Sequence, residues 1–249
     1  MNRSASSAAL AALLAAAAPP ALAHDARSGG VAAEAGNAQV ADFDIVHARV
    51  AVEDGEIVFH MAVSGKAGET KPTSTGTLAG SEVFAYVWPT GIDPYEAGFD
   101  EKAGILAMAV TAHPDFDDTP LRDENGDGDA GNDGDVWHSH WVVLGPDDAC
   151  GAGALKVIDI PKGAKPRLPE TWPGLPLLID SPGFEPSLAD ETVELRVPLA
   201  GMAAAAGASY DGVTAGLRVN ASVHAPLLCV ADVFDVASGD LSLPGRVGE

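Results

Sequence analysis

Residues 135–144 read Asp-Val-Trp-His-Ser-His-Trp-Val-Val-Leu, an alternating run that is typical of a β-strand. Alternate side chains of a strand point to the same face, so His138 and His140 are expected to project together. The rise of a strand places their Cα atoms about 6.5–7 Å apart, a spacing at which two neutral imidazoles can reach one metal ion. On the opposite face, Trp137 and Trp141 are expected to pack in a core, with a sugar-stacking strip as the alternative.

Short apolar runs separated by Gly, Pro and Asp extend over most of the chain and indicate an all-β domain. Asp54-Gly55 supplies the positive φ that a hairpin turn needs between the first two runs. The pattern predicts a single antiparallel β-sandwich of about eight to ten strands over residues 41–249, with a long Pro-rich excursion at 161–186. The expected strands are 43–52, 56–64, 82–88, 105–112, 136–144, 154–160, 192–199, 213–223 and 227–236.

The first 23 residues have the features of a secretory signal peptide. Arg3 precedes a run of Ala and Leu, and Ala21-Leu22-Ala23 offers a cleavage site. Residues 24–40 are small and polar, and we expect them to form a mobile leader. No later segment is apolar for long enough to be a membrane helix. The sequence therefore predicts a periplasmic or secreted protein without membrane insertion.

Charge and cysteine content agree with an exported protein. The formal net charge of −22 repels nucleic acid and anionic lipid and attracts cations, which excludes a nucleic-acid partner. Cys150 and Cys229 are the only cysteines, and an even count in an exported chain predicts one disulfide. Such a bond would close a loop of about 80 residues and contribute about 4.5 kcal/mol in the chain-entropy model.

His60 is the candidate for a third metal ligand. In the run 56–63 the large apolar residues share one strand face, and His60 falls on the other. If this strand neighbours the strand of His138 and His140, three imidazoles converge in an arrangement known for copper and zinc. The alternative is a lone strand histidine packed beside its neighbours. Three further histidines are expected to be structural: His47, His113 and His224.

An upstream strand histidine combined with a downstream His-x-His pair resembles the copper-binding surface and periplasmic proteins of methanotrophs, of the MopE and CorA type. The resemblance implies that His60, His138 and His140 are copper ligands. In that family an oxidised tryptophan two residues before the first histidine completes the copper site, whereas this chain has Val58 there. The resemblance covers three residues of the chain and implies a plain three-histidine site.

A second metal signal precedes the histidine pair. Residues 123–129 read Asp-Glu-Asn-Gly-Asp-Gly-Asp, which places oxygen ligands at positions 1, 3 and 5 and glycine at position 6 of a calcium loop. Gly134 stands at position 12, where such loops carry Glu, and nearby oxygens are expected to replace it. The alternative is a solvated, flexible acidic loop. The candidate calcium ligands are Asp123, Asn125, Asp127, Asp129, Asp133 and Asp135.

Together these features predict an exported protein that binds a transition metal, above all copper, for copper capture or handling. The predicted ligands are His60, His138 and His140, with calcium at the separate acidic site and a periplasmic protein as a possible partner. The alternative is a calcium-stabilised β-sandwich module that binds carbohydrate or protein without catalysis. The chain has no Gly-x-Ser-x-Gly, Walker or His-Glu-x-x-His motif, so an enzyme is the less favoured interpretation.

Overall fold

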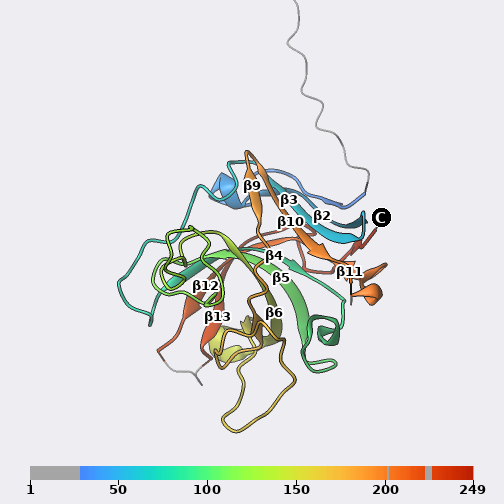
Figure 1. Ribbon diagram of the computed structural model, residues 1–249. Helices are drawn as coiled ribbons and strands as arrows, with labels where there is room; N and C mark the ends of the chain where they lie inside the picture. The colour runs from blue at the N-terminus through green and yellow to red at the C-terminus, as the bar shows by residue number, and fades with distance from the viewer. Residues whose placement is uncertain (1–28, 201, 222–225, 249) are drawn as a thin grey trace, which may run out of the picture.

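The computed structural model describes residues 29–200, 202–221 and 226–248. These residues form a closed β-barrel with a five-stranded sheet packed across one side of it (Figure 1). The predicted signal peptide lies outside the described residues, as does the start of the predicted leader. The described residues contain no helix that is long and apolar enough to cross a membrane.

Six strands form the barrel, in the order β5-β4-β12-β13-β7-β6, and pairing of β5 with β6 closes it. Their bounds are β4 Glu82–Pro89, β5 Ile105–Ala112, β6 His138–Pro146, β7 Leu155–Val157, β12 Val213–Val219 and β13 Leu228–Val236. A short strand, β8 (Ile179–Asp180), also pairs with β6. The barrel therefore carries the predicted histidine pair in its wall, at the start of β6.

The five-stranded sheet has the order β1-β2-β3-β10-β9. Its strands are β1 Val31–Ala32, β2 Ile45–Glu53, β3 Glu56–Val63, β9 Ser187–Ala189 and β10 Thr192–Pro198. A small two-stranded sheet pairs β11 (Ser209–Tyr210) with β14 (Gly245–Arg246). Within the described residues, the helical elements are short 3-10 turns: η1 Ala41–Phe43, η2 Pro94–Ala97, η3 Asp148–Cys150 and η4 Ala203–Ala205.

The all-β class is confirmed, but the prediction of a single β-sandwich is wrong. Antiparallel pairing between β5 and β6, from Ile105 opposite Leu144 to Thr111 opposite His138, closes one sheet on itself. All nine expected strands overlap observed ones. The error lies in strand order. An alternating apolar run specifies which face of a strand is buried, but it does not specify which strand lies beside it.

Two apolar layers hold the molecule together. In the first, between the five-stranded sheet and the barrel wall, the ring of Phe59 lies 5.7 Å from the rings of Trp88 and Trp141. The second layer lines the inside of the barrel. Alternate residues of β6 therefore face the sheet or the lumen, and His138 and His140 belong to the lumen set with Val142.

The structure contains the predicted hairpin turn, disulfide and Pro-rich excursion. Asp54 and Gly55 have φ angles of 50° and 85° and form the predicted turn between β2 and β3. The disulfide between Cys150 and Cys229 is present. The Pro-rich stretch 161–186 is an irregular excursion in which β8 is the only strand.

Residues 29–40, which the sequence assigns to a mobile leader, are held against the sheet. β1 pairs with β2, and the buried carboxylate of Asp44 accepts the backbone N–H groups of residues 36–38 at 2.8–3.1 Å. The hydroxyl of Ser64 donates to the same carboxylate at 2.5 Å. Burial on its own would raise the pKa of Asp44, but the hydrogen bonds from Ser64 and the backbone outweigh it and hold the pKa below its usual value.

We expect Asp44→Ala to lower the free energy of unfolding by about 2–3 kcal/mol, since three backbone N–H groups lose a charged acceptor. Because the folded pKa is depressed, the carboxylate stabilises the fold above its unfolded pKa of about 3.9. That contribution is lost as the pH falls through the folded pKa, so the difference from wild type shrinks in acid. Urea unfolding at pH 7 and pH 2.5, with hydrogen exchange at residues 36–38, measures both effects. Unprotected amides at these positions in the wild type would contradict the prediction.

Candidate metal centre

Two neighbouring strands bring three histidines to one end of the barrel lumen. His138 and His140 face the lumen from β6, and Thr111 of β5 lies opposite His138. His113 follows the end of β5 and continues the lumen-facing series of Ala109 and Thr111. His113, His138 and His140 are therefore neighbours, and their side chains are at most 3% exposed.

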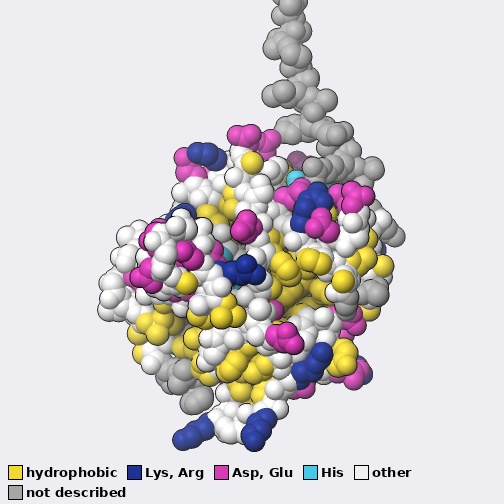
Figure 2. Space-filling view, in the orientation of Figure 1, with side chains coloured by type: hydrophobic (Ala, Val, Ile, Leu, Met, Phe, Trp, Pro, Cys, Tyr) yellow, Lys and Arg dark blue, Asp and Glu magenta, His cyan; other side chains and the backbone are white. Residues whose placement is uncertain are grey.

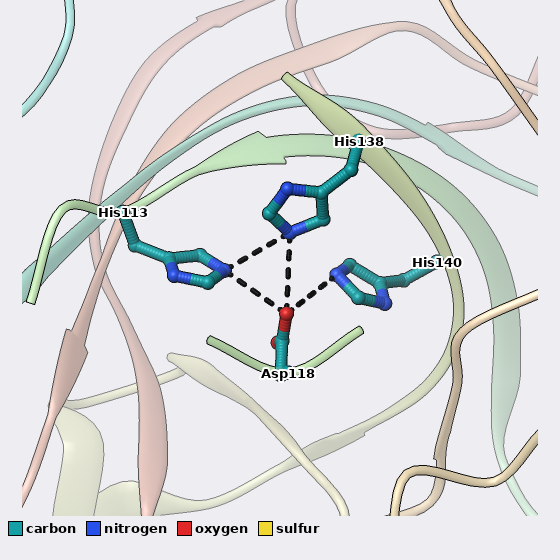
Figure 3. Close-up of side chains that lie close together, drawn as sticks. All are labelled: His113, Asp118, His138 and His140. Atoms are coloured by element: carbon teal, nitrogen blue, oxygen red, sulfur yellow. Dashed lines mark hydrogen bonds and ion pairs between the residues drawn. The ribbon is translucent and has the colours of Figure 1, made fainter. Parts of the chain in front are cut away.

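Asp118 completes the group from the loop between β5 and β6. Its Oδ1 lies 3.2 Å from the Nε2 atom of each of the three histidines (Figure 3). The Nε2 atoms of His113 and His138 are 3.1 Å apart. All four ligand atoms lie within 4.8 Å of one another. We call these four residues the His/Asp cluster: His113, Asp118, His138 and His140.

The Nε2 atom of each histidine faces Asp118, and the contacts of the Nδ1 atom define the tautomer of the ring. The Nδ1 atoms of His113 and His138 lie 2.9 and 2.7 Å from the carbonyl oxygens of Phe116 and Val136. The Nδ1 atom of His140 lies 3.1 Å from the carbonyl oxygen of Asp180. A carbonyl oxygen can only accept, so Nδ1 carries the proton and the neutral ring presents a lone pair at Nε2. This arrangement is the usual second layer of a histidine–metal site.

Without a cation the cluster is electrostatically unfavourable. Three buried lone pairs and a carboxylate oxygen face one another, and neither Asp118 Oδ1 nor His140 Nε2 has a hydrogen-bond partner. Burial on its own would raise the pKa of Asp118, but positive charge on His140 and His113 outweighs it and holds the pKa well below its usual range; a bound metal ion would supply that charge with the rings neutral. The carboxyl group is therefore an anion in a nearly dry environment, which calls for a positive charge.

The distances fit a single metal ion. A tetrahedral site with bonds of ~2.0–2.1 Å, as zinc makes to nitrogen, separates its ligand atoms by about 3.3–3.4 Å. Four of the six separations between these ligand atoms are 3.1–3.2 Å, and the two that join His140 Nε2 to the other imidazoles are within 4.8 Å. Three imidazoles and one carboxylate suit zinc, copper or iron. The His/Asp cluster therefore offers four converging ligand atoms to a transition metal.

The acidic loop, residues 115–135 between β5 and β6, folds back and holds His113 in place. The Phe116 ring stacks on the His113 imidazole at 3.9 Å, and the His113 backbone N–H donates to the carbonyl of Gly134 at 2.6 Å. A Cβ at Gly134 would lie 1.8 Å from the carbonyl oxygen of Phe116, the same oxygen that orients His113. Close packing at the histidine site thus accounts for glycine at the position where a calcium loop has Glu.

His60 is not part of the His/Asp cluster, and its prediction as the third ligand is corrected. It lies on β3, which pairs with β2 and β10, and its ring is 6.0 Å from that of His47. Phe59 and Met61 of β3 face the barrel, so His60 points to the other side of the sheet. The prediction required β3 to neighbour β6, whereas His113, just after the end of the adjacent strand β5, supplies the third imidazole.

The predicted calcium ligands serve mainly as caps within their own loop. The Asp123 carboxylate accepts backbone N–H groups from residues 126–128 at 2.7–3.1 Å. Asn125, Asp127 and Asp129 each accept the N–H two residues ahead at 2.8–3.1 Å. Figure 2 shows these acidic side chains gathered over the exposed loop at the left of the molecule. The clusters of three or more potential ligands in the described residues do not include Asp123, Asp127, Asp129 or Asp135.

One predicted calcium ligand, Asp133, does join a carboxylate group, together with Asp117 and Glu124. Asp133 is fully buried, and its Oδ2 accepts the Glu124 backbone N–H at 2.9 Å. Its Oδ1 has no hydrogen-bond partner. Calcium binding in this loop stays a prediction, and the carboxylates best placed for it differ from those that the sequence pattern indicates.

Cavities lie on both sides of the His/Asp cluster. A cavity of about 280 Å³ occupies the barrel lumen and reaches His113, Asp118 and His140. A second cavity of about 450 Å³ lies under the acidic loop and reaches His138, with Glu124 in its wall. The cluster therefore lies between an apolar cavity in the lumen and a more polar cavity on the loop side.

Comparisons of the chain with family models, with curated proteins and with solved structures found no match. The resemblance to the methanotroph copper proteins therefore stays a prediction, and its His60 component disagrees with the observed geometry.

Proposed function

We propose that this chain is an exported protein that binds one transition-metal ion in the His/Asp cluster, for copper capture or handling. The proposal is carried by the three Nδ1 atoms bonded to backbone carbonyls, which aim three lone pairs at one buried carboxylate oxygen. Copper(II) is favoured because it stands above zinc in the affinity order of nitrogen and oxygen sites. Export is supported by the signal-peptide features of residues 1–23 and by the disulfide.

The alternative of a carbohydrate- or protein-binding module gains no support from the geometry. Carbohydrate stacking would need aromatic side chains displayed on a sheet face. Trp137 and Trp141 are 9% and 3% exposed and pack between the barrel and the five-stranded sheet. The histidines of β6, in contrast, converge with a third histidine and an aspartate.

Metal analysis of the purified protein tests the proposal. Chelator-stripped protein should take up about one Cu(II) per chain, with electron paramagnetic resonance splitting from several nitrogens. Competition against equal free Zn(II) should leave copper in the site. Failure to retain stoichiometric Cu(II) or Zn(II) after gel filtration would overturn metal binding itself, and a preference for zinc would overturn the copper assignment.

A further inference from the structure

The lumen cavity has the character of a small-molecule site. Its volume is about 280 Å³, roughly twice the ~150 Å³ of an apolar protein cavity that binds benzene. Strands β4, β5, β6, β12 and β13 line it with apolar side chains such as Val87, Val142 and Val213. The space therefore suits an apolar body about the size of a fused two-ring aromatic or a medium-length alkyl chain.

Charged groups meet this apolar space at two places. At one end His113, Asp118 and His140 of the His/Asp cluster form part of the wall. The only other charged residue of the described wall is Asp232, which is exposed on β13. A bound ligand can thus have its apolar body in the lumen and one polar group at the buried cluster.

The sign of that polar group follows from charge balance. Within the His/Asp cluster, a divalent metal ion and the Asp118 carboxylate leave one net positive charge beside the apolar lumen. A monoanion compensates this charge, whereas a cation adds to it. An anionic group at a metal also gains from the low dielectric of the lumen.

We propose that the lumen binds an apolar monocarboxylate, aromatic or medium-chain, with its carboxylate at the metal ion of the His/Asp cluster. The position of the carboxylate rests on the proposed function, and the binding of the apolar body does not. In the absence of metal, a carboxylate that enters the apolar lumen loses its hydration without a compensating cation, so the metal-free protein favours a neutral ligand of the same shape.

Isothermal titration with 2-naphthoate and its neutral isostere 2-naphthamide tests both parts. Zn(II)-loaded protein should bind 2-naphthoate about tenfold or more tightly than 2-naphthamide. Chelator-stripped protein should bind 2-naphthamide at least as tightly as 2-naphthoate. A parallel Zn(II) titration of the stripped protein measures metal binding on its own.

Val213→Phe fills the lumen three strands away from β6 and should abolish binding of both naphthyl compounds while Zn(II) still binds. Val40→Phe, at a surface position that is 43% exposed, is the matched control and should leave all affinities unchanged. Retained Zn(II) binding by Val213→Phe shows that the variant is folded.

The outcomes separate the two proposals. Absence of uptake of both Zn(II) and Cu(II) by wild type overturns the metal site, and 2-naphthamide binding to stripped protein still reports on the lumen. Zn(II) uptake with equal affinity for the two compounds overturns the position of the carboxylate. Zn(II) uptake without binding of either compound, or binding that survives Val213→Phe, overturns the lumen as a ligand site.

Discussion

Replacing His113 with alanine is expected to lower the affinity for Cu(II) by at least about 100-fold, whereas His60→Ala leaves it unchanged. Even loss of an outer partner of a metal ligand costs 10–100-fold in typical sites, and His113 is placed as a ligand itself. Its Nε2 lies 3.2 Å from Asp118 Oδ1 and 3.1 Å from His138 Nε2. The alanine variant removes one of three nitrogen donors without touching the wall of β6.

The comparison with His60→Ala distinguishes the loss of a metal ligand from a general loss of fold. Both histidines are buried and both lie on or beside strands of the structure, so a general loss of fold would affect either variant. Competition with a chromophoric copper chelator measures the affinity, and near-ultraviolet circular dichroism checks the fold. Weakened binding in His60→Ala together with full binding in His113→Ala would restore the ligand set predicted from the sequence and refute the His/Asp cluster.

The alternation of lumen-facing residues along β5 points to His113, although this histidine lies just beyond the end of the strand. Residues Ala107, Ala109 and Thr111 alternate toward the lumen, and the same period reaches His113 just after β5 ends. The apolar pattern stops at Ala112, so the histidine looks like part of a loop. Only the pairing of β5 with β6 shows that it adjoins His138, and strand pairing is a tertiary property.

Asp118 could not be singled out for a different reason. It is one of nine acidic residues between positions 115 and 135, and nothing in its local sequence distinguishes it from the others. The structure buries Asp118, with 6% exposure, because the backbone of the loop turns inward there and the Ser181 hydroxyl donates to its carbonyl at 2.7 Å. The strand positions follow from the local alternation of apolar residues, and the disulfide follows from the presence of only two cysteines. Neither prediction needed the strand order, and both succeeded.

Removing the disulfide is expected to lower the free energy of unfolding by about 4 kcal/mol, which for a protein of this size is a fall in Tm of roughly 10 °C. The bond joins residues 79 positions apart, so reduction gives the unfolded chain much more conformational freedom. The effect is large because most single changes cost 0.5–3 kcal/mol.

The position of the bond adds a structural reason. Cys229 lies at the start of β13 and Cys150 at the end of η3, beside the junction where β13 meets β7. That junction has one register pair, Cys229 with Lys156, whereas β12 and β13 share seven. The disulfide therefore secures the part of the barrel wall with the fewest backbone contacts.

The metal site should survive this change, because its ligands come from β6 and from the segment that joins β5 to β6. Thermal unfolding of wild type, reduced wild type and a Cys150→Ala/Cys229→Ala variant measures the effect, with Cu(II) uptake measured in parallel. The reduced protein and the double variant should agree in Tm and should still bind one Cu(II). An unchanged Tm in both would show that the seam between β7 and β13 is held by packing, and loss of Cu(II) uptake would show that the cluster depends on that seam.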